Sequence, residues 1–274
     1  MSEITATSAL KPLLKFPFQG PDWRNRFLIG SAVTLAGFFV PLLPAIFVSG
    51  YTVAIMRRAI QGQDLELPAW NDWGKLGVDG LRLAVVSLAY TLPGILVLSG
   101  GWVLYMIASF AFPLLMSGAG GRGNDGMVML GVLAMFGSLA ILLLSMFLGF
   151  ILILLALIPL PAAMAHFVAQ DKVAAGFRVR EWWPLLRANR SGYFAAWVVV
   201  FGLITILNFA IALAYYSVVL CCLIPFLAAP VSFYVSAIAL ALFGQTYRES
   251  RTLALPPVPT GGIEGGRHQA SVES

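Results

Sequence analysis

Every Asp, Glu, Lys and Arg residue of this chain lies outside four long apolar blocks. The blocks are Leu28–Met56, Leu83–Gly121, Gly126–Ala165 and Ser191–Tyr247, which contain 29, 39, 40 and 57 residues. A helix of about 20 predominantly apolar residues is already long enough to cross the hydrocarbon core of a bilayer. Uncharged segments of this length therefore indicate helices that lie in lipid rather than a water-soluble core.

The composition supports the same class of protein. Hydrophobic residues make up 59% of the chain and charged residues 11%, whereas soluble domains average about 45–50% and about 25%. We therefore expect an all-α fold: a polytopic integral membrane helical bundle with interrupted or re-entrant helices and interfacial amphipathic segments. The net charge of +5 fits the Lys and Arg residues that collect on the cytoplasmic side of membrane proteins. Membrane lipids are the expected partners, and nucleic acid is not.

The chain divides into three parts. Residues 1–26 form an N-terminal interfacial segment, in which apolar and basic side chains alternate between Leu10 and Arg26. Residues 27–247 form the transmembrane domain. The tail, residues 248–274, is rich in Gly, Pro and charged residues and is expected to be disordered.

The first block contains the sequence Pro41-Leu42-Leu43-Pro44, and prolines favour a break because each removes a backbone donor. A re-entrant hairpin broken here would leave both ends of the block on the cytoplasmic side. Its arms of about 14 residues would each be too short to span the membrane. A single crossing, which would violate the positive-inside rule, is the alternative. The other blocks then supply four spanning helices.

The later blocks are longer than one straight crossing requires. Blocks two and three can each form one tilted helix that extends past the membrane, or a broken pair of helices. Block four is expected to divide into helices at about Tyr193–Val218 and Ile224–Tyr247, around Cys221-Cys222. The basic connectors at residues 50–82 and 166–190, together with the C-terminus, are expected on the cytoplasmic side.

The two basic connectors resemble each other, as an internal repeat of about residues 27–116 and 127–218 would require. In each, a Pro-containing start is followed by an amphipathic segment, positive charges, tryptophans and a new apolar helix. Such repeats are common in transporters, although apolar sequences also match by chance. Within block three, Ser145 and Gly149 have the four-residue spacing that allows close helix packing in lipid.

The sharpest local pattern lies between Gly50 and Leu81. Its characteristic positions are Gly50, Tyr51, Arg57, Leu67, Pro68, Trp70, Asp72, Trp73 and Gly80. With these residues the chain resembles an uncharacterised family of prokaryotic membrane proteins, the domain of unknown function 4013, over most of residues 15–245. The resemblance implies an all-helical, multi-pass protein of bacteria or archaea. That family has no established activity, so the resemblance assigns no catalytic residue.

The residue types in this motif favour a structural role. Trp70 and Trp73 suit the membrane interface, since indole joins an apolar body to one hydrogen-bond donor. Asp72 can cap the following turn by accepting hydrogen bonds from backbone N–H groups, or it can pair with Arg57 or Arg58. An anchored elbow, which sets how the next helix enters the membrane, is therefore favoured over a ligand site.

Basic and aromatic side chains also gather in the second connector, at Arg178, Arg180, Trp182, Trp183 and Arg187. Such side chains can contact the phosphates of lipid headgroups. They can also form an ordinary interfacial belt of tryptophans and cytoplasmic arginines, which is the favoured interpretation.

No pattern in the sequence indicates catalysis, a cofactor or a metal site. His166 and His268 are isolated, and His166 is interpreted as a polar cap on a helix end. There is no cluster of zinc ligands and no phosphate-binding glycine loop. We therefore expect a non-enzymatic, multi-pass protein of the plasma (inner) membrane. It would organise lipid or protein partners, or copies of itself, at the cytoplasmic face. The alternative is a carrier for a small neutral or amphiphilic solute.

Overall fold

The computed structural model of the protein describes residues 12–118, 125–216 and 218–254. These residues form helices joined by short connections, without a β-strand among them, which confirms the predicted all-α fold class. In chain order the elements are the 3₁₀ helix η1 (Phe16–Phe18) and the α-helices α2 (Trp23–Ala36), α3 (Leu43–Gln61), α4 (Trp73–Gly118), α5 (Asp125–Leu157), α6 (Leu160–Gln170), α7 (Val173–Gly176), α8 (Val179–Ala188), α9 (Arg190–Tyr215) and α10 (Val218–Ala254).

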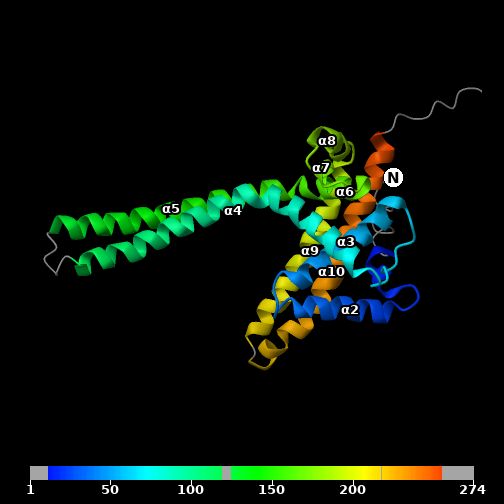
Figure 1. Ribbon diagram of the computed structural model, residues 1–274, viewed down its shortest axis with the longest axis horizontal. Helices are drawn as coiled ribbons and strands as arrows, with labels where there is room; N and C mark the ends of the chain where they lie inside the picture. Colours follow the sequence, from blue (N-terminus) through cyan, green and yellow to red (C-terminus); the bar gives the residue numbers. More distant parts are fainter. Residues whose placement is uncertain (1–11, 119–124, 217, 255–274) are drawn as a thin grey trace, which may run out of the picture.

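Helix α10 lies at the centre of the body of the protein. It packs against α2, α3, α6, α8 and α9, and Figure 1 shows these helices grouped around it. Two clusters of buried apolar side chains fill the body. One joins Tyr51 and Ile55 of α3 to Phe233 and Ile238 of α10, and the other joins α3 and α10 to α6, α8 and α9. Both basic connectors are therefore attached to the same central helix.

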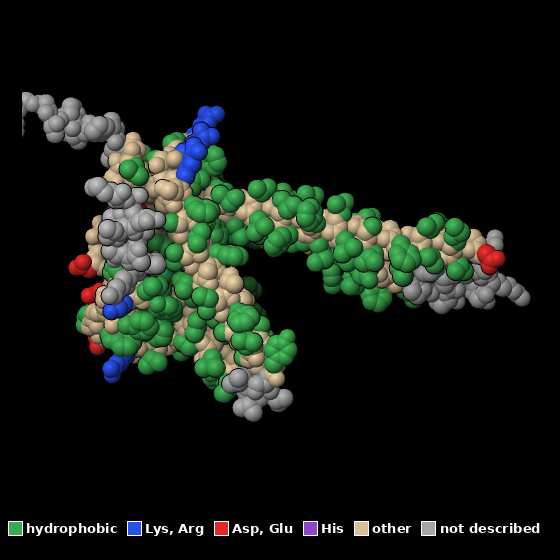
Figure 2. All heavy atoms as spheres, turned by 180° about the vertical axis from the view of Figure 1, so that it is seen from behind, with side chains coloured by type: hydrophobic (Ala, Val, Ile, Leu, Met, Phe, Trp, Pro, Cys, Tyr) green, Lys and Arg blue, Asp and Glu red, His purple; other side chains and the backbone are tan. Residues whose placement is uncertain are grey.

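Helices α4 and α5 form a long hairpin that projects from this body (Figure 1). With 46 residues, α4 is about 69 Å long, more than twice the thickness of a hydrocarbon core of about 30 Å. Neither Pro93 nor Gly100-Gly101 interrupts it, so block two forms one continuous helix rather than a broken pair. Figure 2 shows hydrophobic side chains along the shaft of the hairpin and charged side chains on the body and at the tip.

Small residues allow the two helices of the hairpin to approach closely. A Cβ atom at Gly94 would lie 2.5 Å from Ile153 Cγ1, and one at Gly149 would lie 2.9 Å from the carbonyl oxygen of Gly94. A Cβ atom at Gly101 would overlap with the side chain of Ser145. The close packing predicted from Ser145 and Gly149 is therefore confirmed.

The first block is broken at the predicted prolines, because α2 ends at Ala36 and α3 begins at Leu43. Helix α3 has 19 residues and is longer than the predicted arm, since it continues through Arg57 and Arg58 to Gln61. Within the described part of the chain, five helices are long and apolar enough to cross a membrane: α3, α4, α5, α9 and α10. Helix α3 is thus a candidate span in addition to the four that were predicted.

Two boundaries near the C-terminus differ from the prediction. Helix α9 ends at Tyr215 and α10 begins at Val218, so the turn precedes Cys221-Cys222 and the cysteines lie within α10. Helix α10 continues to Ala254, and the start of the predicted disordered tail is therefore helical. Ser250 is buried in this extension and donates a hydrogen bond of 2.7 Å to the carbonyl oxygen of Thr246, whereas the residues around it are exposed. The remaining tail, residues 255–274, lies outside the described residues.

Part of the N-terminal segment packs against the body of the protein, and its position at the membrane interface stays a prediction. Leu13 and Phe16 are buried in one cluster with Tyr51 of α3. Tyr234 of α10 donates a hydrogen bond of 2.8 Å to the carbonyl oxygen of Leu14. Leu13, Leu14 and Phe16 therefore contact protein, whereas the side chain of Phe18 stays 45% exposed.

Candidate functional site

The first connector is built around a backbone contact between α3 and α4. A Cβ atom at Gly50 would lie 1.8 Å from the carbonyl oxygen of Leu76, and one at Gly80 would lie 1.9 Å from that of Ile46. These distances leave no room for any side chain, so the two helices touch through their backbones at this crossing. Gly50 and Gly80, which lie far apart in the motif, are therefore the two halves of one contact.

Tyr51 and Trp70 hold the extended segment between these helices. Their rings are stacked, with centroids 4.0 Å apart and planes 7° from parallel, and Tyr51 Oη donates to the carbonyl oxygen of Pro68 over 2.7 Å. Trp70 Nε1 donates to the carbonyl oxygen of Arg26 over 3.0 Å. The Arg26 guanidinium in turn donates to the carbonyl oxygen of Leu67. Tyr51 and Leu67 are fully buried, so neither side chain is accessible to a ligand.

Asp72 caps the start of α4. Its Oδ1 atom accepts a hydrogen bond of 2.9 Å from the backbone nitrogen of Lys75, which confirms the predicted capping role. The alternative, a pair with Arg57 or Arg58, is wrong: Arg57 pairs with other carboxylates, and Arg58 donates to the carbonyl oxygen of Glu66 over 3.3 Å.

Trp73 completes the elbow at the first turn of α4. Its ring meets that of Phe47 of α3 edge to face, with centroids 5.5 Å apart, and lies 5.3 Å from that of Trp70. One side of Trp73 stays exposed, as expected for a tryptophan at a membrane interface.

Arg57 belongs to a cluster of four charges that joins the two connectors. Its guanidinium lies 3.0 Å from Asp79 Oδ2 and 3.1 Å from Asp171 Oδ1. Arg82 lies 3.7 Å from an oxygen of each of these carboxylates. Asp79 is buried, and both of its carboxylate oxygens lie beside an arginine. Sequence reasoning missed Asp171, because no local pattern links it to α3 or α4.

His166 is not isolated, which corrects its interpretation as a simple helix cap. Its buried ring lies with Nδ1 2.7 Å from Tyr247 Oη and Nε2 3.0 Å from Glu181 Oε2. Gln170 donates to the same carboxylate oxygen over 3.0 Å, and Arg178 donates to Glu181 Oε1 over 3.2 Å. The hydrogen bond from His166, and next that from Gln170, lower the pKa of Glu181. This network joins α6, α8 and α10.

Helix α8 has one buried face and one exposed face. Trp182 is 1% exposed and donates from Nε1 to the carbonyl oxygen of Gly176 over 3.1 Å. Trp182, one of the possible headgroup contacts, is therefore not accessible to a headgroup. Trp183 is 38% exposed, and the Arg187 guanidinium lies 5.2 Å from the centroid of its ring. Adjacent residues of a helix point about 100° apart, which separates the two tryptophans.

Three arginines on this exposed side lack an acidic partner. Arg180, Arg187 and Arg190 are exposed, and none forms an ion pair with a carboxylate of residues 12–118, 125–216 or 218–254. Arg178, in contrast, is paired with Glu181 over 3.2 Å. Of the predicted headgroup contacts, Arg180, Trp183 and Arg187 are thus the ones whose positions leave them open to a ligand.

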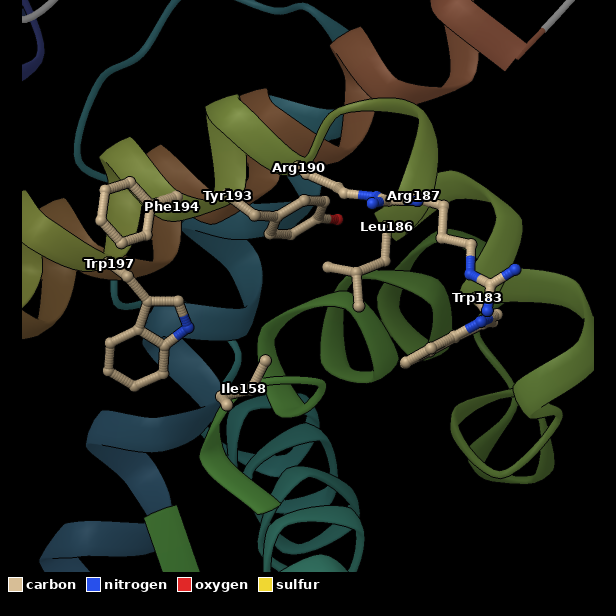
Figure 3. A pocket seen from close by; sticks show the side chains of 8 residues that line it. All are labelled: Ile158, Trp183, Leu186, Arg187, Arg190, Tyr193, Phe194 and Trp197. Atoms are coloured by element: carbon tan, nitrogen blue, oxygen red, sulfur yellow. The ribbon is translucent and has the colours of Figure 1, made fainter. Parts of the chain in front are cut away.

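A cavity of about 700 Å³ lies between α8, the start of α9 and the end of α5. Figure 3 shows Arg187 and Arg190 on one side of the cavity and mainly apolar side chains on the opposite side. The lining residues are Ile158, Trp183, Leu186, Arg187, Arg190, Tyr193, Phe194 and Trp197. Sequence reasoning missed the cavity. Four of its lining residues, Arg190, Tyr193, Phe194 and Trp197, follow one another on α9 at intervals of three or four residues, which places them on one face of the helix.

The corner between α8 and α9 places Arg187 and Arg190 beside each other. Asn189, a buried residue between the helices, accepts a hydrogen bond of 3.1 Å from the Gly192 nitrogen and caps α9. Its amide also donates to the carbonyl oxygen of Thr246 over 3.4 Å. This corner is therefore fixed to α10 by side-chain contacts.

Among the described residues, no three His, Cys, Asp or Glu side chains are grouped so that they could hold a metal ion. Comparison with curated proteins and with solved structures found no match. The model of one protein family, described as a protein of unknown function (DUF4013), matches residues 33–216. This segment contains both connectors and most of the candidate spans. The chain therefore belongs to the DUF4013 family.

Proposed function

We propose that this membrane protein organises anionic lipids at the cytoplasmic face of a prokaryotic plasma membrane, without catalysing a reaction. The observation that carries this function is the set of unpaired arginines Arg180, Arg187 and Arg190 beside the exposed ring of Trp183. Arg180, Trp183 and Arg187 lie on α8, at the surface of the body, and Arg190 is the first residue of the candidate span α9.

The physical reason is the chemistry of the headgroup layer. Anionic lipids give the cytoplasmic leaflet a negative surface potential, and each Lys or Arg near it contributes about 1 kcal/mol of attraction. A guanidinium binds phosphate through two parallel hydrogen bonds, and tryptophan prefers the same layer. The inner face of α8 is occupied by Trp182 and Leu186, so the helix is held against the protein while its basic side stays open.

The experiment compares lipid-dependent stabilisation of the purified full-length protein. A ligand that binds only the native state raises the melting temperature. We expect phosphatidylglycerol to raise the melting temperature more than phosphatidylcholine does. The triple variant Arg180→Gln/Arg187→Gln/Arg190→Gln should lose most of this difference.

The matched control is the triple variant Arg24→Gln/Lys75→Gln/Arg251→Gln. It removes the same charge from exposed positions outside α8 and α9 and should keep the preference for phosphatidylglycerol. Equal loss in both triple variants would show that net charge, rather than this surface, attracts the lipid. That result would remove the proposed function.

A carrier for a small neutral or amphiphilic solute is the second candidate. Two segments of the chain share one order of elements: an apolar helix, a break, a helix with Pro at its start, a connector and a long helix. In the first segment the three helices are α2, α3 and α4, and in the second they are α5, α6 and α9. This order is what an internal repeat would produce. The described cavity, however, is lined mainly by apolar side chains at the edge of the body, which favours lipid binding over passage of a polar solute.

A further inference from the structure

We propose that the cavity between α8 and α9 holds one phospholipid, with an acyl chain inside the cavity and the phosphate between Arg187 and Arg190. This inference rests on the proposed function and deepens it. The basic surface of α8 would attract anionic lipids in general, whereas the cavity would hold a single molecule in one defined position.

The cavity has the size and the lining that an acyl chain requires. Its volume of about 700 Å³ lies within the range of roughly 300–1,000 Å³ that is typical of small-molecule sites. Ile158, Leu186, Phe194 and Trp197 supply apolar surface. A free phosphate ion would leave this surface without a partner, so the ligand must have an apolar part.

The position of the cavity favours a membrane lipid. Helix α8 ends at the corner where the candidate span α9 begins, so the cavity lies where headgroups give way to hydrocarbon. Phe194, on the rim, is 71% exposed, as expected of a side chain that faces lipid. An acyl chain can therefore enter sideways from the bilayer without leaving its apolar surroundings.

The polar end of the site decides which lipid binds. Lipid tails are as apolar as the protein surface that they contact, so filling the cavity does not by itself select one lipid over another. Arg187 and Arg190 are the charged lining residues, and Figure 3 shows them along the same side. Two guanidinium groups without carboxylate partners in the described part of the chain complement one phosphate and favour an anionic headgroup.

Trp197 provides a second, independent indication of a ligand. Its Nε1–H group is buried and has no hydrogen-bond partner among the described residues, which is rare for a polar group in a folded protein. Trp197 lines the cavity on the opposite side from the arginines (Figure 3). The ester carbonyl of a phospholipid lies on the tail side of the phosphate and can accept this hydrogen bond.

Native mass spectrometry of the full-length protein in detergent, with added dioleoyl-phosphatidylglycerol, tests the proposal. We expect one tightly retained lipid per protein chain. Arg187→Gln and Arg190→Gln should each weaken its binding by about tenfold, since a lost charge-assisted contact changes affinity on that scale. Arg24→Gln is the matched control, because Arg24 also lies over a tryptophan ring, that of Trp23, at 5.5 Å. It should retain the lipid.

Ile158→Trp separates this inference from the proposed function. Ile158 is 55% exposed and lines the cavity, so a larger ring there fills the acyl-chain space while all three arginines are retained. We expect the retained lipid to be lost while the melting temperature still rises more with phosphatidylglycerol than with phosphatidylcholine. Retention of the lipid by Ile158→Trp, or equally strong binding of glycerol phosphate, would overturn the inference and leave the proposed function standing.

Discussion

Gly50 and Gly80 show how a single atom decides the geometry of the first connector. A methyl group at Gly50 would overlap the carbonyl oxygen of Leu76 at 1.8 Å, so Gly50→Ala must push α3 and α4 apart. We expect a loss of roughly 3 kcal/mol in unfolding free energy, at the upper end of the cost of overpacking. Thermal unfolding of the purified protein measures this loss.

The matched control is Gly202→Ala on α9, where a Cβ atom would meet nothing within 4 Å. Alanine is the better helix former by about 1 kcal/mol, so this substitution should leave stability unchanged or raise it slightly. If Gly50→Ala behaves like Gly202→Ala, the helices do not touch through their backbones.

Glu181 gives the second connector a dependence on pH. Hydrogen bonds from His166 and Gln170 lower the pKa of this carboxyl group in the folded protein below its ordinary value of 4.5. The unfolded chain therefore binds the proton more readily. The contribution of Glu181 is fully present above pH 4.5 and is lost as the pH falls through the lower pKa of the folded state.

We therefore expect α8 to become less protected as the pH falls below about 4.5. Hydrogen exchange of the α8 amides at pH 6 and pH 4, corrected for the intrinsic exchange rate, measures this effect. Glu181→Gln removes the ionisable group and should abolish the difference between the two conditions. A difference of the same size in Glu181→Gln would assign the pH dependence to another group.

At the scale of single elements, the α4–α5 hairpin depends on small residues rather than on charge. A Cβ atom at Gly149 would lie 2.5 Å from Leu98 Cγ and 2.9 Å from the carbonyl oxygen of Gly94. Gly149→Val should therefore separate the two helices and lower the unfolding free energy by about 1–3 kcal/mol. Gly137→Val, at a position on the same helix with nothing within 4 Å, is the control and should stay near wild type in thermal unfolding.

The elements also show which features could be predicted from the sequence. The absence of charge from long blocks predicts the helices, and the prolines at Pro41 and Pro44 predict the break between α2 and α3, because both effects are local. The spacing of Ser145 and Gly149 predicts a packing face for the same reason. The continuity of α4 through Pro93 was left open by the sequence, because a proline favours a break but does not require one.

Long-range contacts account for what was missed at the candidate site. Trp182 and Trp183 are adjacent tryptophans, but Trp182 is buried and Trp183 is exposed. The difference comes from the way α8 packs on the body, which the sequence of α8 alone does not contain. His166 has no polar partner nearby in the sequence, but α10 brings Tyr247 Oη within 2.7 Å of its Nδ1 atom. Gly50 and Gly80 were singled out in the sequence as separate motif positions, but their contact at one backbone crossing becomes visible only when α3 and α4 are placed side by side.

At the scale of the whole molecule, the charge cluster constrains the topology. Arg57 lies in the first connector and Asp171 in the second, and their side chains are 3.1 Å apart. The two connectors must therefore face the same side of the membrane. The end of α4 and the start of α5 lie far from these connectors, as do the end of α9 and the start of α10 (Figure 1). If each helix pair spans the bilayer, these helix ends face the opposite side.

Single cysteines at exposed positions test this arrangement, after Cys221 and Cys222 are replaced by serine. Cysteines at Gln63 and Lys172 should react with a membrane-impermeant maleimide only in inside-out vesicles, since both connectors carry the arginines that favour the cytoplasm. Cysteines at Asp125 and Tyr216 should react only in intact cells. Labelling of Asp125→Cys from the cytoplasmic side would mean that the α4–α5 hairpin does not cross the membrane. Labelling of Gln63→Cys and Lys172→Cys from opposite sides would be incompatible with the contact between Arg57 and Asp171.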